Sequence, residues 1–134
     1  MRSVLVNGVF DIIHPGHIAL LNYARQQGDS LTVAIDSDQR VRRNKGPGRP
    51  VNSQSTRKLL LENLRAVDIV VVFDSDSELC QLIQQADVVV KGSDYQFSSW
   101  VGQDLSIEVI WFDRIAEYST TATIQRVVAG AARS

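Results

Sequence analysis

Residues 3–17 read SVLVNGVFDIIHPGH, and this stretch decides the fold. Its first seven residues are nearly continuous in hydrophobicity, as in a strand covered on both faces. Pro15 is favoured in the first turn of a helix, where its missing N–H would have had no helical partner. Gly16 leaves room for a group to approach the backbone. The stretch therefore predicts a strand, a loop and a helix start, whose free N–H groups and positive dipole end attract phosphate.

Similar runs rich in Val and Ile recur along the chain and alternate with helical patterns. We expect strands at residues 3–9, 30–36, 67–73, 87–91 and 107–111, and helices at 16–27, 53–66, 77–85 and 120–131. This alternation implies a mostly parallel sheet built from right-handed crossovers. A chain of 134 residues, 44% of them apolar, suffices for one such core. The prediction is an α/β fold, a single doubly wound Rossmann-like domain over residues 1–134 with a five-stranded sheet.

Two segments carry more specific expectations. In the last helix, Ser119 or Thr120 can cap the start, and one apolar face should dock on the sheet, formed by Ile124, Val127, Val128 and Ala131. Residues 40–50 combine basic side chains with two glycines and two prolines. Because glycine and proline interrupt regular structure, we expect an exposed basic loop there, after the second strand.

Charge and composition exclude several classes of function. Lys and Arg total 14 against 15 Asp and Glu, so the net charge of -1 offers no global attraction to nucleic acid. The basic loop also lacks interleaved aromatic residues for stacking bases, which disfavours the alternative of a nucleic-acid-binding module. We find neither a signal-peptide pattern nor a membrane-spanning run, and therefore expect a cytoplasmic protein without a membrane partner.

The two histidines of the chain lie close together at the start of the predicted first helix. His14 and His17 are three residues apart, so their imidazoles point to the same side of a helical turn. In an open α/β sheet the ligand crevice lies at the carboxyl ends of the strands, where this segment falls. Zinc would need at least three protein ligands, and Cys80 is the only cysteine. The pattern favours a cationic cradle for a phosphate over a metal site.

The segment from Asn7 to His17 resembles the H-x-G-H signature of the cytidylyltransferase-like nucleotidyltransferases. Four further blocks follow in the order of that family: Lys45-Gly46, Arg49 to Asn52 with Arg57, Lys91 to Tyr95, and Ser119 to Thr121. The second and third of these blocks are most similar to the nucleotidyl domain of ADP-heptose synthases. Arg114 instead resembles a basic residue of the glycerol-3-phosphate cytidylyltransferases, and Ser55-Thr56 replace an acidic residue and its neighbour that both subgroups usually carry.

The resemblance implies an activity and a set of partners. It implies transfer of a nucleoside monophosphate from ATP or CTP, with ATP favoured, to a phosphorylated sugar or polyol such as heptose 1-phosphate, with release of pyrophosphate. Cytidylyl transfer to glycerol 3-phosphate is the alternative within the class, and a silent nucleotide sensor is the alternative outside it. The resemblance also implies Mg²⁺, held mainly by the nucleotide phosphates, and a homodimer, for which Trp100 and Trp111 are interface candidates.

The resemblance further assigns roles to particular residues. The catalytic group comprises His14, His17 and Lys45, with Arg42 and Arg43 as possible helpers of the lysine. Acceptor binding falls to Arg49 and Arg57. Nucleotide binding falls to Val9, Phe10, Asp11, Gly16, Lys91, Gly92, Asp94, Arg114, Ser119, Thr120 and Thr121.

Overall fold

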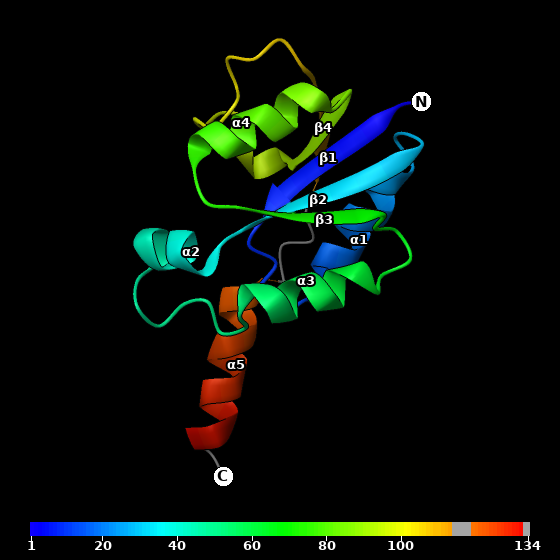
Figure 1. Cartoon of the computed structure of the whole chain (residues 1–134). Coiled ribbons are helices and arrows are strands. Elements are labelled where there is room, and N and C mark those ends of the chain that lie inside the picture. The colour runs from blue at the N-terminus through cyan, green and yellow to red at the C-terminus, as the bar shows by residue number, and fades with distance from the viewer. Residues whose placement is uncertain (114–118, 133–134) are drawn as a thin grey trace.

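A five-stranded parallel sheet forms the centre of the molecule (Figure 1). The computed structural model describes residues 1–113 and 119–132. The strands are β1 (Ser3–Gly8), β2 (Ser30–Asp36), β3 (Ile69–Phe73), β4 (Val88–Gly92) and β5 (Glu108–Phe112). Their order is β3-β2-β1-β4-β5, and all four neighbouring pairs are parallel. The order reverses beside β1, so the ligand crevice of such a fold lies at the carboxyl ends of β1 and β4.

Helices cover both faces of the sheet, which confirms the predicted doubly wound arrangement. In Figure 1, α1 and α3 lie on one face and α4 on the other. The helices are α1 (Pro15–Arg25), α2 (Asp38–Lys45), α3 (Gln54–Glu62), α4 (Asp76–Gln85) and α5 (Thr120–Ala132), with a short 3₁₀ turn, η1 (Ser93–Tyr95), after β4.

Alternate residues of each strand feed two separate cores. Val4 and Val6 of β1 pack into the cluster under α1 and α3, whereas Leu5 packs into the cluster under α4. Successive side chains of a strand point to opposite faces, so a strand covered on both sides must be apolar at every position. The near-continuous Val and Ile runs of the sequence meet this requirement.

The predicted basic loop is wrong over its first half, because residues 38–45 form helix α2. The Ser37 hydroxyl accepts a hydrogen bond from the Arg40 N–H at 3.1 Å and caps the helix. Basic residues in the last turn favour the helix dipole. Gly46, with φ of 99°, ends the helix. Glycine and proline begin only at position 46, so they stop this helix and do not prevent it.

The predicted docking of α5 on the sheet is also wrong for the second half of that helix. Val127 and Val128 are 67% and 63% exposed, and Figure 1 shows the helix running away from the sheet. The apolar spacing correctly indicates a helix, but it does not specify what covers the apolar face. Among the described residues, none of the helices combines the length and the apolar character needed to cross a membrane.

Candidate active site

A cleft of about 710 Å³ opens at the carboxyl ends of the central strands. Its walls come from the loops after β1, β2 and β4 and from the starts of α1 and α5. It gathers most of the predicted site residues: Val9, Phe10, Asp11, His14, Gly16, His17, Lys45, Arg49, Lys91, Gly92, Asp94, Ser119, Thr120 and Thr121. Arg57 does not line it. Arg114 lies outside the described residues.

The loop between β1 and α1 has a backbone conformation that non-glycine residues seldom adopt. Phe10 and Ile12 both have φ of 53°, a region that is costly for side chains with a Cβ and recurs at functional sites. Gly8 permits this path, because a Cβ there would lie 2.9 Å from the folded-back Phe10 ring. That ring is buried and its centroid lies 5.1 Å from the centroid of the His17 imidazole. The Phe10 side chain of this loop therefore packs against His17 and helps to fix its position.

The two histidines cap helix α1 reciprocally. The Gly16 N–H donates to His14 Nδ1 at 3.1 Å, and the His14 N–H donates to His17 Nδ1 at 3.2 Å. The rings are stacked with centroids 3.8 Å apart. A nitrogen that accepts a hydrogen bond carries no proton, so in both rings Nε2 is the nitrogen that can act as a donor. The Nδ1 atoms of both rings serve the helix cap, and both histidines line the cleft.

Asp11 lines the cleft and connects its own loop to residues 51–52 and to the start of α5. Its carboxylate is 1% exposed and accepts hydrogen bonds from the Val51 N–H at 2.7 Å and the Asn52 N–H at 2.9 Å. Arg49 Nε lies 3.7 Å from the same carboxylate, without a hydrogen-bond partner among the described residues. The Thr120 hydroxyl donates to the Asp11 carbonyl. Because both carboxylate oxygens are engaged, Asp11 holds the site together here and contributes backbone, not free charge, to the cleft.

Lys91 places a buried amine at the base of the cleft. Its Nζ lies 3.3 Å from Asn7 Oδ1, 4.7 Å from the centroid of the Trp100 ring and 5.1 Å from that of Tyr95. Burial holds the pKa of Lys91 below its ordinary value, against the opposing effect of Asp36 and Asp94. A negatively charged ligand in the cleft would favour the charged form of the amine. Sequence analysis did not single out Asn7 for this contact, although its place at the end of β1 was the available signal.

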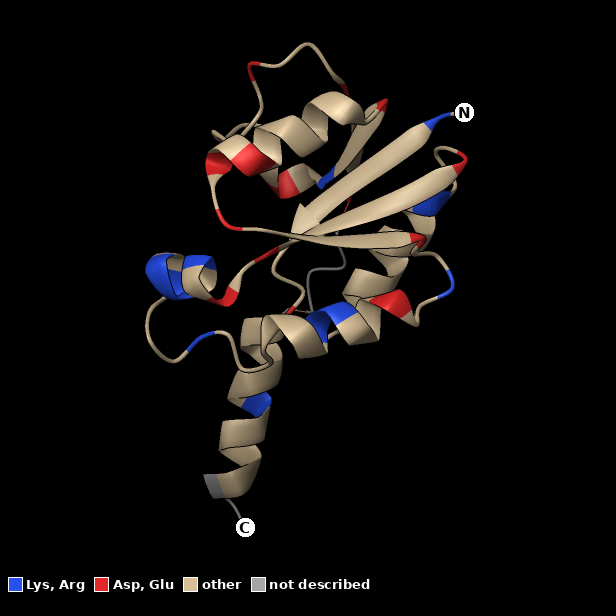
Figure 2. Ribbon diagram, in the orientation of Figure 1, with Lys and Arg blue, Asp and Glu red and all other residues tan. Residues whose placement is uncertain are grey.

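The basic residues of α2 divide into fixed and exposed groups. Figure 2 shows Lys and Arg gathered on this helix. Arg40 lines the cleft as a fixed wall, bonded to Asp36 at 3.0 Å and to Asp76 at 2.8 Å. Lys45, at the end of the helix, is exposed and lines the cleft. Arg42 and Arg43 do not line it, so only one of the predicted exposed cations of α2 faces the site.

Two helix starts converge on the cleft. Ser119 Oγ accepts from the Ala122 N–H at 3.0 Å and caps α5, while Thr120 is bonded to the loop that precedes α1. The N-termini of α1 and α5 therefore direct their positive dipole ends to one place. A Rossmann-like sheet with two helix starts, two histidines and a lysine around one cleft is the arrangement of a phosphate-binding α/β protein.

Comparison with known sequences identifies the family. Residues 5–127 match the cytidylyltransferase-like family, and the chain belongs to it, which confirms the family predicted from the H-x-G-H signature. The chain is 44% identical to the bifunctional protein HldE of Nitratiruptor sp. and 47% identical to that of Mesorhizobium japonicum, with 94% and 92% of this chain covered. It spans 28% and 26% of those two proteins, which is about a quarter of their length.

Solved structures share the fold. The lipopolysaccharide core biosynthesis protein from Thermoplasma volcanium superposes with a TM-score of 0.69 at 23% identity, over 86% of this chain and 98% of that one. A pantothenate synthetase from Thermus thermophilus superposes with a TM-score of 0.56 at 18% identity, over 98% of this chain and 67% of that one. These likenesses establish the Rossmann-like architecture.

Proposed function

We propose that this chain transfers AMP from ATP to heptose 1-phosphate, giving ADP-heptose and pyrophosphate. The observation that carries the proposal is the meeting of the His14–His17 pair with the starts of α1 and α5 in one cleft. Identity of 42–47% to several HldE proteins supports the choice of substrate, as does the similarity of the 49–52 and 91–95 blocks to ADP-heptose synthases.

The chemistry requires positioned donors and no enzyme nucleophile. A phosphate oxygen of the acceptor attacks the α-phosphorus of ATP, the bond from that phosphorus to the β-phosphate oxygen breaks, and pyrophosphate leaves with the electron pair. Negative charge builds on the oxygens around the α-phosphorus. The Nε2–H groups of His14 and His17 donate to those oxygens, and each such preorganised donor contributes about 3 to 4 kcal/mol to transition-state binding.

The other site residues receive roles from where they lie in the cleft. Lys45 binds the triphosphate from the end of α2. The hydroxyls and N–H groups of Ser119, Thr120 and Thr121 bind the β- and γ-phosphates. The nucleoside and the α-phosphate lie against residues 9–16 and 91–94. Arg49 attracts the acceptor phosphate. Arg114 contacts the nucleotide, as the resemblance implies.

We infer that Mg²⁺ accompanies the nucleotide. No group of three or more His, Cys, Asp or Glu side chains that could hold a metal occurs within residues 1–113 and 119–132. Mg²⁺ in phosphoryl-transfer sites needs only one or two carboxylates, with phosphates and waters as its remaining ligands. Asp36 and Asp94 line the cleft and are suited to this arrangement. Bound Mg²⁺ would neutralise charge on the departing pyrophosphate.

A pyrophosphate-release assay tests the proposal. ATP, CTP, GTP and UTP are each combined with heptose 1-phosphate and with glycerol 3-phosphate, and each is also supplied alone. We expect release only when ATP and heptose 1-phosphate are both present. Release with CTP and glycerol 3-phosphate would instead establish the glycerol-3-phosphate cytidylyltransferase activity, which the Arg114 resemblance favours. Nucleotide binding with no turnover for any pair would refute the enzyme and leave a nucleotide sensor.

We further propose a homodimer, as the family resemblance implies. The exposed Val127 and Val128 of α5 offer an apolar surface for it. The tryptophans are less suitable than expected, because Trp100 packs over Lys91 and edge-on against Trp111, with ring centroids 6.3 Å apart. Sedimentation velocity decides between a monomer and a dimer, and Val128→Asp should shift a dimer to monomer.

A further inference from the structure

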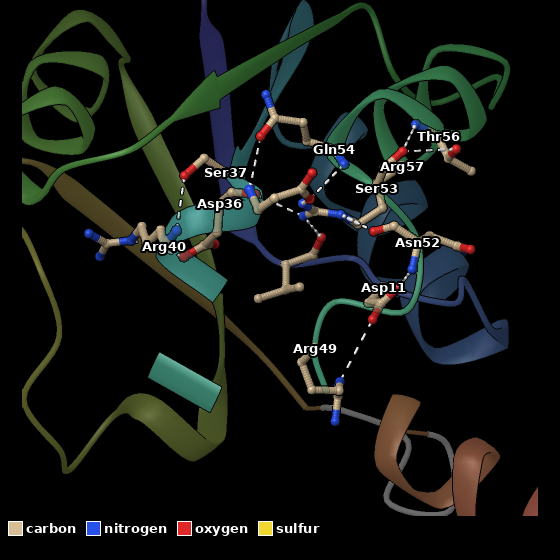
Figure 3. A network of polar contacts seen from close by, with 12 residues as sticks. Asp11, Asp36, Ser37, Arg40, Arg49, Asn52, Ser53, Gln54, Thr56 and Arg57 are labelled. Carbon is tan, nitrogen blue, oxygen red and sulfur yellow. Dashed lines mark hydrogen bonds and ion pairs between the residues drawn. The ribbon is translucent and has the colours of Figure 1, made fainter. Parts of the chain in front are cut away.

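We propose that Arg57 is a positioning residue, which fixes the histidine loop and helix α2 relative to each other; the inference rests on the nucleotidyl transfer proposed above. Arg57 was expected to bind the acceptor. Its side chain is instead 1% exposed and does not line the cleft. Figure 3 shows its guanidinium enclosed between the ends of β1 and β2 and the start of α3.

Four hydrogen bonds occupy the Arg57 guanidinium. Nε donates to the Asn52 carbonyl at 3.0 Å, and Nη1 donates to the Val9 and Asp36 carbonyls at 2.9 and 2.8 Å. Nη2 donates to the Asp38 carboxylate at 2.8 Å. The acceptors lie in three stretches of the chain, at residue 9, residues 36–38 and residue 52, so one side chain joins three segments.

The two strand carbonyls explain why a guanidinium is needed there. The ladder between β1 and β2 ends at the pair Gly8–Ile35, and the strands part beyond it. The carbonyls of Val9 and Asp36 lie one residue beyond the last pair of this ladder. A buried carbonyl without a donor is costly. Only arginine carries donors on a flat, rigid fork that can reach both carbonyls and a carboxylate at once.

Asp38 carries the same fixation into α2. It is the first residue of that helix and accepts from Arg57 and from the Gln54 N–H at 2.8 Å. The Asp38 N–H in turn donates to Gln54 Oε1 at 2.9 Å. These bonds fix the starts of α2 and α3 relative to each other. They therefore also fix the direction of α2, whose last residue is Lys45.

The consequence for catalysis follows from the positions of the acceptors. Val9 begins the loop that ends at His14 and leads into α1, which carries His17, whereas Asp38 begins α2, which carries Lys45. These groups must contact one triphosphate simultaneously, and a misplacement of about 1 Å can cost on the order of 100-fold in rate. Arg57 does not line the cleft, so it acts through the two segments that it holds.

The test compares Arg57→Lys with Leu61→Ala. Leu61 is 0% exposed and lies one turn further along the same face of α3, but it contacts only the apolar core, so its truncation loosens the helix without touching the polar network. We expect Arg57→Lys to lower kcat by roughly 10- to 100-fold with KM for ATP within about threefold of wild type. Leu61→Ala should lower the melting temperature and keep kcat within about twofold, at a temperature where both variants are folded.

Hydrogen–deuterium exchange supplies a readout independent of turnover. Arg57→Lys should speed amide exchange in residues 10–17 and 38–45, and Leu61→Ala should not. If Arg57→Lys does not fold, Asp38→Asn takes its place, with faster exchange in 38–45 and a smaller fall in kcat. Equal losses of kcat in the Arg57 and Leu61 variants, or unchanged exchange in both segments, would overturn the proposal. If the wild type turned over no acceptor, the proposed function would fail, and the exchange measurements would still decide the positioning role.

Discussion

Replacing His17 separates its two roles in the structure. The imidazole caps α1 through Nδ1, which accepts the His14 N–H at 3.2 Å, and the residue lines the cleft, where we propose that Nε2–H is the catalytic donor. His17→Ala removes both. His17→Gln keeps an oxygen that can accept the same N–H, since glutamine at the third position of a helix is a usual partner in a capping box. The glutamine variant therefore retains the cap and loses the imidazole donor.

The two roles predict different magnitudes. Loss of a cap costs about 1 kcal/mol, which for a domain of this size lowers the melting temperature by about 4 °C. Loss of one preorganised donor costs about 3 to 4 kcal/mol of transition-state stabilisation, or at least ~100-fold in turnover. We expect His17→Ala to show both losses, and His17→Gln to melt near wild type while staying at least ~100-fold slower.

Pyrophosphate release at saturating substrates and thermal unfolding by circular dichroism measure the two quantities on the same preparations. Near-normal turnover in His17→Gln would show that the histidine matters only as a cap, and the donor assignment would be withdrawn. A normal melting temperature in His17→Ala would refute the capping argument. The two outcomes are independent of each other.

Three further predictions concern the rest of the site. Lys45→Ala should lower turnover by roughly 100-fold without changing the melting temperature, while Arg42→Ala, an exposed cation of the same helix that does not line the cleft, should leave turnover near wild type. Asp11→Asn should lower the free energy of unfolding in urea by about 1–3 kcal/mol, because its amide presents a donor to one of the two part-buried N–H groups that the carboxylate now accepts from. Burial holds the pKa of Lys91 in the folded protein below its ordinary value of 10.5. At a pH between the folded and the unfolded pKa, the unfolded chain binds the proton more tightly, so stability rises with pH. The destabilisation is complete below the folded pKa, and the gain in unfolding free energy from Lys91→Met should therefore shrink as the pH rises toward 10.5; a gain that grew with pH would contradict the burial argument.

The helices show how far local patterns reach. Residues 40–45 were predicted as a loop because of neighbouring glycines and prolines, although Ser37 and Asp38 form a helix start that the sequence already contained. For α5 the reverse holds. Its helical spacing was correct, but the exposure of Val127 and Val128 depends on where the helix lies relative to the sheet, and no periodicity specifies that.

The sequence by itself determined the alternation of strands and helices and the placement of His14 and His17 at a helix start, because these depend on residues within a few positions of one another. The tertiary structure decided the partners of the charged groups. Arg57 donates to Val9 across 48 positions, Asp11 accepts from Val51 across 40, and Lys91 reaches Asn7 across 84. The residue type determines which hydrogen bonds a side chain can form, but the crossovers of the sheet determine which distant acceptors come within reach. A buried positioning arginine and a substrate-binding arginine therefore look alike in the sequence.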